Sequence, residues 1–184
     1  LTVQNEPYLM PQLPSENRAQ VEEGIRRGCY ALRGATELGD VAADAPTLQL
    51  LGSGSILQFV LEAQEILVRD HGVRADVWSV TSYNELRREA LEVEEANRAQ
   101  RLRGDDAATS WLEDTLGATD GAVLAASDWM TLVPDQLTRW LGRRLSSVGT
   151  DGFGMSDTRE ALRAHFGVDT PAIVAAALWQ LGLD

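Results

Sequence analysis

The chain has 184 residues, of which 44% are hydrophobic and 24% charged, as in a single compact globular domain. Its net charge is −12, and all sixteen basic residues are arginines. Because so acidic a chain repels phosphate backbones and anionic lipids, we expect it to bind neither nucleic acid nor a membrane. Cys29 is the single cysteine, which excludes an intrachain disulfide and a cysteine-based metal site and fits a reducing cytoplasm.

The N-terminal region has the features of a continuation from a longer polypeptide. The sequence lacks an initiator methionine, and residues 1–4 resemble the end of a strand, so we expect a fragment. The opening shows no charged-then-apolar order of a signal peptide, and no apolar run is long enough to span a membrane. Three prolines predict that residues 1–15 are an extended connector, which leaves residues 16–184 as the folded domain.

The folded part alternates between predicted strands and helices. The predicted strands cover residues 29–33, 48–51, 77–80, 122–126 and 146–149. The predicted helices cover residues 16–27, 56–71, 84–102, 129–140, 157–166 and 170–182. Trp129 and Leu137 share one face of their helix, and Pro134 predicts a break within it. Strands and helices that alternate over short connections predict an α/β fold with a mostly parallel sheet.

The run Gly52-Ser53-Gly54-Ser55 lies between a buried strand and a helix. Backbone N–H groups at such a helix start can bind an anion, which makes Ser53, Gly54 and Ser55 a candidate anion site. The spacing is not the dinucleotide-binding fingerprint, and there is no phosphate-binding lysine. The alternative is a tight turn whose glycines allow the strand and the helix to pack closely.

A second glycine-rich segment covers residues 149–157, with three glycines around Phe153. These glycines predict a constrained loop with unusual backbone angles. Ser156 or Asp157 can cap the next helix, with Glu160 in reach of a capping box. The segment follows the carboxyl end of a strand, where α/β domains present ligands, so Asp151 is a candidate loop-site residue. The alternative is a purely structural loop.

The remaining polar residues do not form a catalytic constellation in the sequence. His71 and His165 fall at helix C-termini, where a cation complements the helix dipole, and we expect surface roles for both. The helix at 84–102 carries four clustered glutamates: Glu89, Glu92, Glu94 and Glu95. Arginines are interleaved with them, so we predict a solvated charged face and no metal site. Cys29 is predicted to be a small core residue.

Several stretches together resemble the homodimeric type of pyruvate dehydrogenase E1. They are residues 5–11 with 23–28, residues 50–57, residues 77–86 and residues 149–160. The resemblance runs over nearly the whole chain, in order and with matching gaps. It implies a three-layer α/β/α sandwich around a five-stranded, mostly parallel sheet with one antiparallel strand. Residues 29–33 are the expected antiparallel member.

The resemblance also implies an activity that belongs to a larger enzyme. Family members are homodimers of three-domain subunits that use thiamine diphosphate and Mg²⁺ to decarboxylate pyruvate. They pass the acetyl unit to the lipoyl group of the E2 acyltransferase. The cofactor and metal ligands of the family belong to domains upstream of this region, so the resemblance implies that this chain binds no cofactor and is inactive alone. Its implied partners are the upstream domains, a second E1 subunit and E2.

The resemblance assigns a place to two individual residues. Tyr8 matches a tyrosine close to the family's active site, and its phenol is the candidate substrate-channel group. Phe59 stands where other members can have a histidine, so a proton-handling role there does not carry over. Two alternatives of a different class are a freestanding module that binds a small anion and a dimerisation module without any site.

Overall fold

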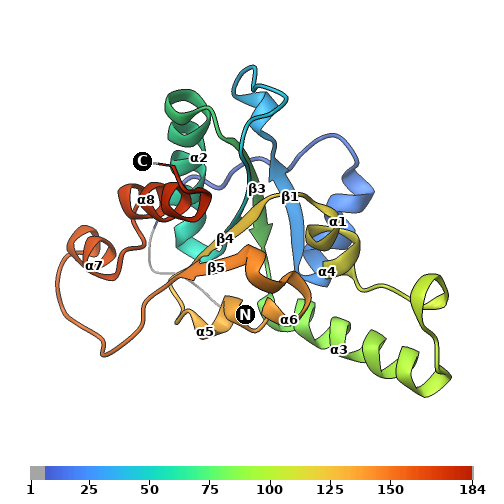
Figure 1. Cartoon of the computed structure of the whole chain (residues 1–184). Coiled ribbons are helices and arrows are strands. Elements are labelled where there is room, and N and C mark those ends of the chain that lie inside the picture. The colour runs from blue at the N-terminus through green and yellow to red at the C-terminus, as the bar shows by residue number, and fades with distance from the viewer. Residues whose placement is uncertain (1–6, 184) are drawn as a thin grey trace.

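The computed structural model describes residues 7–183, apart from the side chains of Asp105 and Arg143. Its five strands form one sheet in the order β1-β3-β2-β4-β5 (Figure 1). Their bounds are Cys29–Arg33 (β1), Thr47–Gly52 (β2), Arg74–Val80 (β3), Ala122–Ala126 (β4) and Leu145–Val148 (β5). Strand β1 is antiparallel to β3, whereas all other neighbours are parallel. The predicted five-stranded sheet with residues 29–33 as its antiparallel member is confirmed.

Helices cover both faces of this sheet (Figure 1). The α-helices are α1 (Arg18–Arg27), α2 (Leu57–His71), α3 (Tyr83–Gln100), α4 (Trp111–Asp114), α5 (Leu132–Asp135), α6 (Thr138–Leu141), α7 (Arg159–Phe166) and α8 (Thr170–Leu181). Short 3-10 helices cover Ala35–Glu37, Gly54–Ile56, Gly104–Asp106, Leu116–Ala118 and Gly142–Arg144. One apolar cluster lies under α2 and α8, and a second lies under α3, α4 and α6. The three-layer α/β/α sandwich is therefore confirmed.

Strand β2 occupies the centre of the sheet and is buried on both faces. Leu48 and Leu50 belong to the cluster under α2 and α8, whereas Leu51 belongs to the opposite cluster. Gln49 is the polar exception, and its side-chain oxygen accepts a hydrogen bond from Trp78 Nε1 at 2.7 Å. Alternate side chains of a strand point to opposite faces, so this pattern explains why both faces need a covering layer.

A buried amide joins α2 to the antiparallel edge of the sheet. The side chain of Gln64 is fully buried, and its Nε2 donates to the carbonyl oxygens of Arg33 at 3.1 Å and Ala75 at 2.8 Å. Its Oε1 accepts from Arg33 Nε at 2.5 Å. The amide thus forms hydrogen bonds with carbonyl oxygens of β1 and β3. The apolar side chains of α2 could not supply donors for these oxygens.

An ion pair joins α1, α3 and α4 on the other side of the sheet. The Arg27 guanidinium donates to both carboxylate oxygens of Glu89 and lies 4.9 Å from the centre of the Trp111 ring. Glu89 Oε1 also accepts from the backbone N–H of Trp111 at 2.9 Å. The prediction of a solvated face is wrong for Glu89, because an arginine distant in sequence covers that carboxylate.

The structure corrects the predicted helix over residues 129–140. Two short helices, α5 and α6, replace it, and the helical stretch begins only at Leu132. Trp129 is half exposed while Leu137 is fully buried, so the two do not share a buried face. Ser127 Oγ accepts from Trp129 N–H at 3.3 Å, which holds the chain in a turn after β4. Pro134 lies in the first of the two helices, in agreement with the predicted break.

Smaller differences occur at helix starts. Helix α1 begins at Arg18, and its N-cap is Asn17 in the left-handed conformation, a region that asparagine tolerates better than most residues. Helix α7 is capped by Thr158, whose Oγ1 accepts from the N–H of Ala161, so the expected capping by Ser156 or Asp157 is wrong. The predicted strand character of residues 1–4 lies outside the described part of the chain. Residues 7–14 form neither helix nor strand.

Replacement of Gln64 tests the buried amide. We expect Gln64→Leu to lower the free energy of unfolding by about 1–3 kcal/mol, because it leaves buried carbonyl oxygens without a donor. Gln100→Leu, at the exposed end of α3, is the matched control, with an expected change below about 0.5 kcal/mol. Urea unfolding followed by circular dichroism measures both, and equal midpoints for the two variants would contradict the assigned role.

The Arg27–Glu89 pair predicts a pH-dependent stability. Burial raises the pKa of Glu89, but the hydrogen bonds from Arg27 and Trp111 outweigh it and hold that pKa below its ordinary value of 4.5. Because the pKa is lower in the folded state, the stabilisation is present above about pH 4.5 and is lost as the pH falls below it.

We therefore expect Glu89→Gln to lower the free energy of unfolding by about 1 kcal/mol at pH 7, a magnitude typical of partly exposed charged pairs. The difference from wild type should shrink as the pH falls from about 5 to about 3. Glu92→Gln removes an exposed partner of Arg88 on the same helix and is the control. Unfolding curves at several pH values would reject the assignment if the two variants behaved alike.

Candidate functional site

The carboxyl ends of three parallel strands bring the two glycine-rich segments to one edge of the sheet. Gly52 at the end of β2 pairs with Ala126 of β4, and Ala126 pairs with Val148 of β5. The loops that follow these strands therefore start side by side. This edge is where α/β domains bind ligands, and it holds the sequence-predicted residues Ser53, Gly54, Ser55 and Asp151.

The first loop is built for close packing of β2 and α2. A Cβ atom on Gly52 would lie 2.7 Å from Leu57 Cδ1 and 3.1 Å from Leu57 Cα, so a larger residue would require the Leu57 side chain and the start of α2 to shift. Ser53 and Ser55 are buried, and Gly54 has a left-handed backbone with φ of +54°. The geometry therefore agrees with the alternative of a tight packing turn.

A carboxylate lies against this turn. Asp128, in the loop after β4, has its Oδ2 3.4 Å from Ser55 Oγ. A fixed negative charge at that position repels a second anion. The candidate anion site at Ser53, Gly54 and Ser55 stays a prediction, and Asp128 counts against it. For the same reason the turn does not fit a diphosphate group.

The second loop is tied to the loop after β4 by four hydrogen bonds. Asp151 accepts from the N–H of Thr131 at 3.0 Å and from its hydroxyl at 2.6 Å. Thr150 donates from its N–H to Trp129 O at 2.9 Å and from its hydroxyl to Asp128 O at 2.7 Å. Asp151 therefore has a structural role in the described fold, as a clamp between two loops.

A cavity of about 360 Å³ lies between this edge and α7. Ser55, Asp128 and Thr150 form its sheet side, and Arg159 and Leu162 form part of its helix side. The Arg163 guanidinium, also at the cavity, lies 4.6 Å from the centre of the Phe59 ring. Phe59 thus packs beneath a cation, a role that involves no proton transfer.

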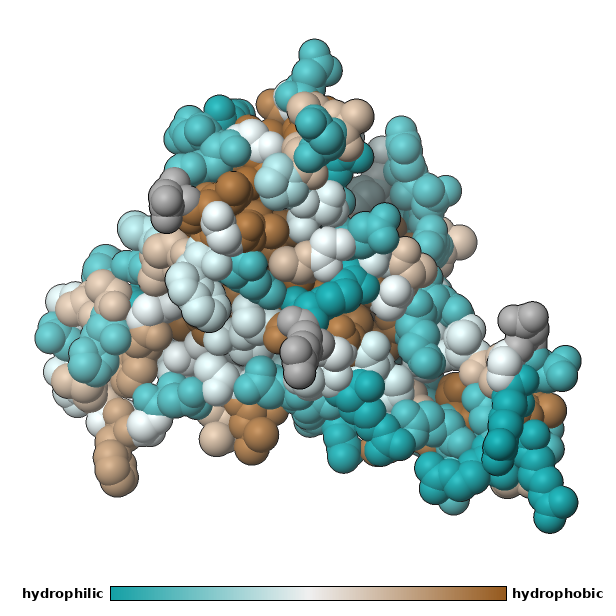
Figure 2. Space-filling model, viewed as in Figure 1, coloured by the Kyte–Doolittle hydropathy of each residue, from teal (hydrophilic) through white to brown (hydrophobic). Residues whose placement is uncertain are grey.

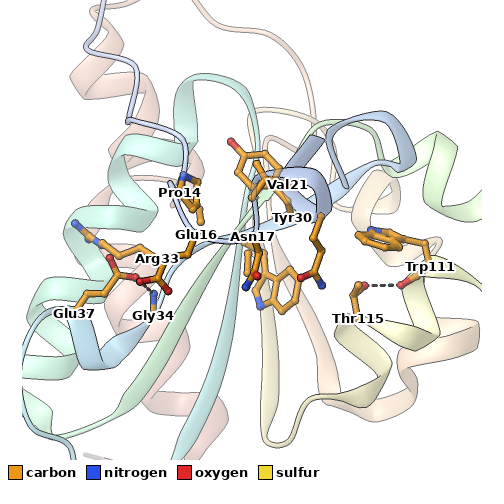
Figure 3. Close-up of a pocket in the computed structure, with 14 residues that line it drawn as sticks. Pro14, Glu16, Asn17, Val21, Tyr30, Arg33, Gly34, Glu37, Trp111 and Thr115 are labelled. Carbon is orange, nitrogen blue, oxygen red and sulfur yellow. Dashed lines mark hydrogen bonds between the residues drawn. The ribbon is translucent and has the colours of Figure 1, made fainter. Parts of the chain in front are cut away.

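A second pocket, of about 230 Å³, lies along β1, the antiparallel strand at the side of the sheet (Figure 3). Asn17 and Tyr30 lie at its centre, and Trp111 closes one end. The Trp111 Nε1 already donates to Cys29 O at 2.9 Å. This pocket contains polar and aromatic groups without a nucleophile–base pair among the described residues that line it, so it offers no evident chemistry.

The other predicted residues lie apart from both pockets. Tyr8 is half-buried in the N-terminal segment and does not line the cavity at the carboxyl edge. His71 and His165 are exposed at the ends of α2 and α7, as predicted. Cys29 is fully buried, which confirms the predicted core residue, and burial raises the pKa of its thiol to about 11.

Neither a metal site nor a membrane span emerges from the described residues. Within residues 7–183, no three histidine, cysteine, aspartate or glutamate side chains are grouped as metal ligands would be. No helix in the same range combines the length and the apolar character needed to cross a bilayer.

Two residues of the carboxyl edge, Asp128 and Thr131, could not be identified as site residues from the sequence. Their partners are distant in the chain, and neither residue stands in a glycine-rich motif.

Comparison with known proteins identifies the class to which this fold belongs. Residues 28–169 match the family model of the transketolase-like TK C-terminal domain, so the chain belongs to that family. It resembles the solved structures of a transketolase variant from Pichia stipitis (TM-score 0.56, 15% identity, 94% of this chain and 20% of that one) and of a transketolase from Campylobacter jejuni (0.54, 17%, 84% and 19%). These likenesses concern the fold.

Closer relatives have a more specific name. The chain is 44% identical over 179 residues to the pyruvate dehydrogenase E1 component of Pseudomonas aeruginosa and 40% identical over 186 residues to that of Mycolicibacterium smegmatis. It is also 40% identical over 182 residues to that of Escherichia coli. These matches cover 97%, 100% and 98% of this chain. The chain spans about a fifth of the length of these relatives (19% in each).

Replacement of Asp151 tests the clamp between the loops. Asp151→Ala removes both acceptors for Thr131, so we expect amide exchange at Thr131 to accelerate at least about tenfold and the free energy of unfolding to fall by about 0.5–1.5 kcal/mol. Asp157→Ala is the matched control, because Asp157 lies in the same segment and accepts from the adjacent Thr158 N–H at 2.7 Å, a bond that does not link the two loops. Hydrogen exchange followed by mass spectrometry measures the difference, and unchanged protection of Thr131 in Asp151→Ala would refute the clamp.

Proposed function

We propose that this chain is the C-terminal region of a pyruvate dehydrogenase E1 subunit. The observation that supports this most directly is about 40% identity to E1 components along nearly the whole chain, together with the family-model match. In this proposal residues 1–15 connect the domain to the upstream part of the subunit, and residues 16–184 form the domain. The whole subunit oxidatively decarboxylates pyruvate in the cytoplasm and transfers the acetyl unit to the lipoyl group of E2.

The proposal gives this chain a supporting part in that reaction. Thiamine diphosphate with Mg²⁺ supplies the carbanion chemistry in the whole enzyme and is held by the upstream domains. The turn at residues 53–55 does not fit the diphosphate of that group, because it faces the carboxylate of Asp128. The domain instead pairs with upstream domains and a second E1 subunit, and Tyr8 borders the substrate channel. Its own chemistry is limited to shape and positioning.

An activity assay tests the proposal. We expect the isolated chain to turn over no pyruvate with thiamine diphosphate and Mg²⁺, and to restore activity when fused to the upstream part of the Pseudomonas aeruginosa relative. The upstream part alone is the control. Turnover by the isolated chain, or a folded dimeric fusion without activity, would contradict the proposal. So would an intact gene product, measured by mass spectrometry, with no thiamine diphosphate region ahead of these residues.

A further inference from the structure

Five large apolar side chains stand exposed at the carboxyl edge of the sheet, four on the two loops and one, Leu132, at the start of α5. Their exposed fractions are 49% for Trp129, 50% for Met130, 65% for Leu132, 95% for Phe153 and 54% for Met155. We call this set the carboxyl-edge platform. Figure 2 shows hydrophobic surface along the lower border of the view, both near α5 and at the tip of the loop before α7.

The platform is held in place by its backbone. The bonds from Thr131 and Thr150 join the two loops, and a Cβ on Gly149 would lie 2.4 Å from Trp129 O, so the loops approach as closely as glycine allows. Surfaces that are ordered before binding lose less conformational entropy when a partner docks. The exposed side chains of Trp129, Met130 and Leu132 therefore stand on or beside a preorganised backbone, and Phe153 and Met155 follow the clamped residues 150 and 151 directly in the chain.

The composition of the platform is that of the centre of a protein interface. Tryptophan, methionine and phenylalanine are enriched in interface cores, and clustered exposed apolar groups mark interaction sites in soluble proteins. Phe153 and Met155 also line the cavity at this edge, but Phe153 keeps 95% of its surface exposed, so a ligand confined to that cavity would leave most of this side chain uncovered. A polypeptide partner explains both the area and the chemistry.

The length of the E1 relatives selects the partner. The chain spans 19% of their length, so in the proposed subunit about four fifths of the polypeptide lies outside these residues and is covalently joined to them. On the basis of the proposed function, we propose that the carboxyl-edge platform is the surface on which the upstream part of the same E1 subunit docks.

Methionine oxidation tests the docking directly. Met130 and Met155 react with hydrogen peroxide in proportion to their exposure. We expect both to oxidise at least about tenfold more slowly in the full-length gene product than in this chain alone, because a docked surface excludes solvent. Trp179, 81% exposed on α8, is the internal reference and should label equally with hydroxyl radicals in both. An unreactive Cys29 thiol verifies that the isolated chain is folded.

A pair of variants makes the test specific. Phe153→Ser with Met155→Ser in the full-length protein should raise the oxidation rate of Met130 at least about fivefold, whereas Trp179→Ser should leave it within about twofold.

Other outcomes would contradict the proposal. If Met130 and Met155 oxidise at the same rate in an active full-length enzyme and in the isolated chain, the docking proposal is overturned while the proposed function stands. Protection that rises with the concentration of the isolated chain would replace the upstream partner with a second copy. A gene product without an upstream region would remove both proposals at once.

Discussion

The burial of β2 on both faces is the constraint on which the rest of this structure depends. A central strand with Leu48 and Leu50 on one face and Leu51 on the other is stable only if helices cover both sides. Parallel neighbours on each side then require long crossovers, which α2 and the α3–α4 segment provide. The same parallel arrangement places the ends of β2, β4 and β5 at one edge, so the loop geometry follows from the core.

The sequence was informative where one face of an element is uniformly apolar. All five strands and the long helices α2, α3 and α8 were predicted close to their observed bounds, because their periodicity is set by burial within the element itself. The helix at 129–140 failed for the opposite reason. Its apparent face mixed the buried Leu137 with the half-exposed Trp129, and a hydrogen bond from the Trp129 N–H to Ser127 Oγ gave that stretch a turn. The local hydrogen bond therefore outweighed the helical spacing of the apolar residues at the start of this segment.

The polar groups that matter were less predictable, because their partners lie far away in the chain. In the sequence, nothing distinguishes Gln64 from other polar helix residues. Its role appears only in the fold, where β1 and β3 place two carbonyl oxygens beside its amide. Glu89 is one of four clustered glutamates in the sequence, and only the fold shows that the Arg27 guanidinium pairs with its carboxylate. Asp151 was identified as a loop candidate, but its link to Thr131, twenty positions earlier, gives it a structural role. Residue type and spacing located the segment, and only the fold supplied the partner.

The carboxyl edge shows why a site predicted by fold class need not bind a small ligand. In α/β sheets this edge gathers free backbone N–H groups and helix N-termini, which favour anions. Here Asp128 brings a negative charge to the turn at residues 53–55, and Asp151 occupies the N–H and hydroxyl of Thr131. The polar groups of Asp151 and Thr131 are thus used within the chain, while Phe153 and its apolar neighbours stay exposed. An edge whose loops are hydrogen-bonded to each other and whose apolar side chains stay exposed is suited to contact with another part of a protein, because the burial of those side chains would contribute favourable free energy.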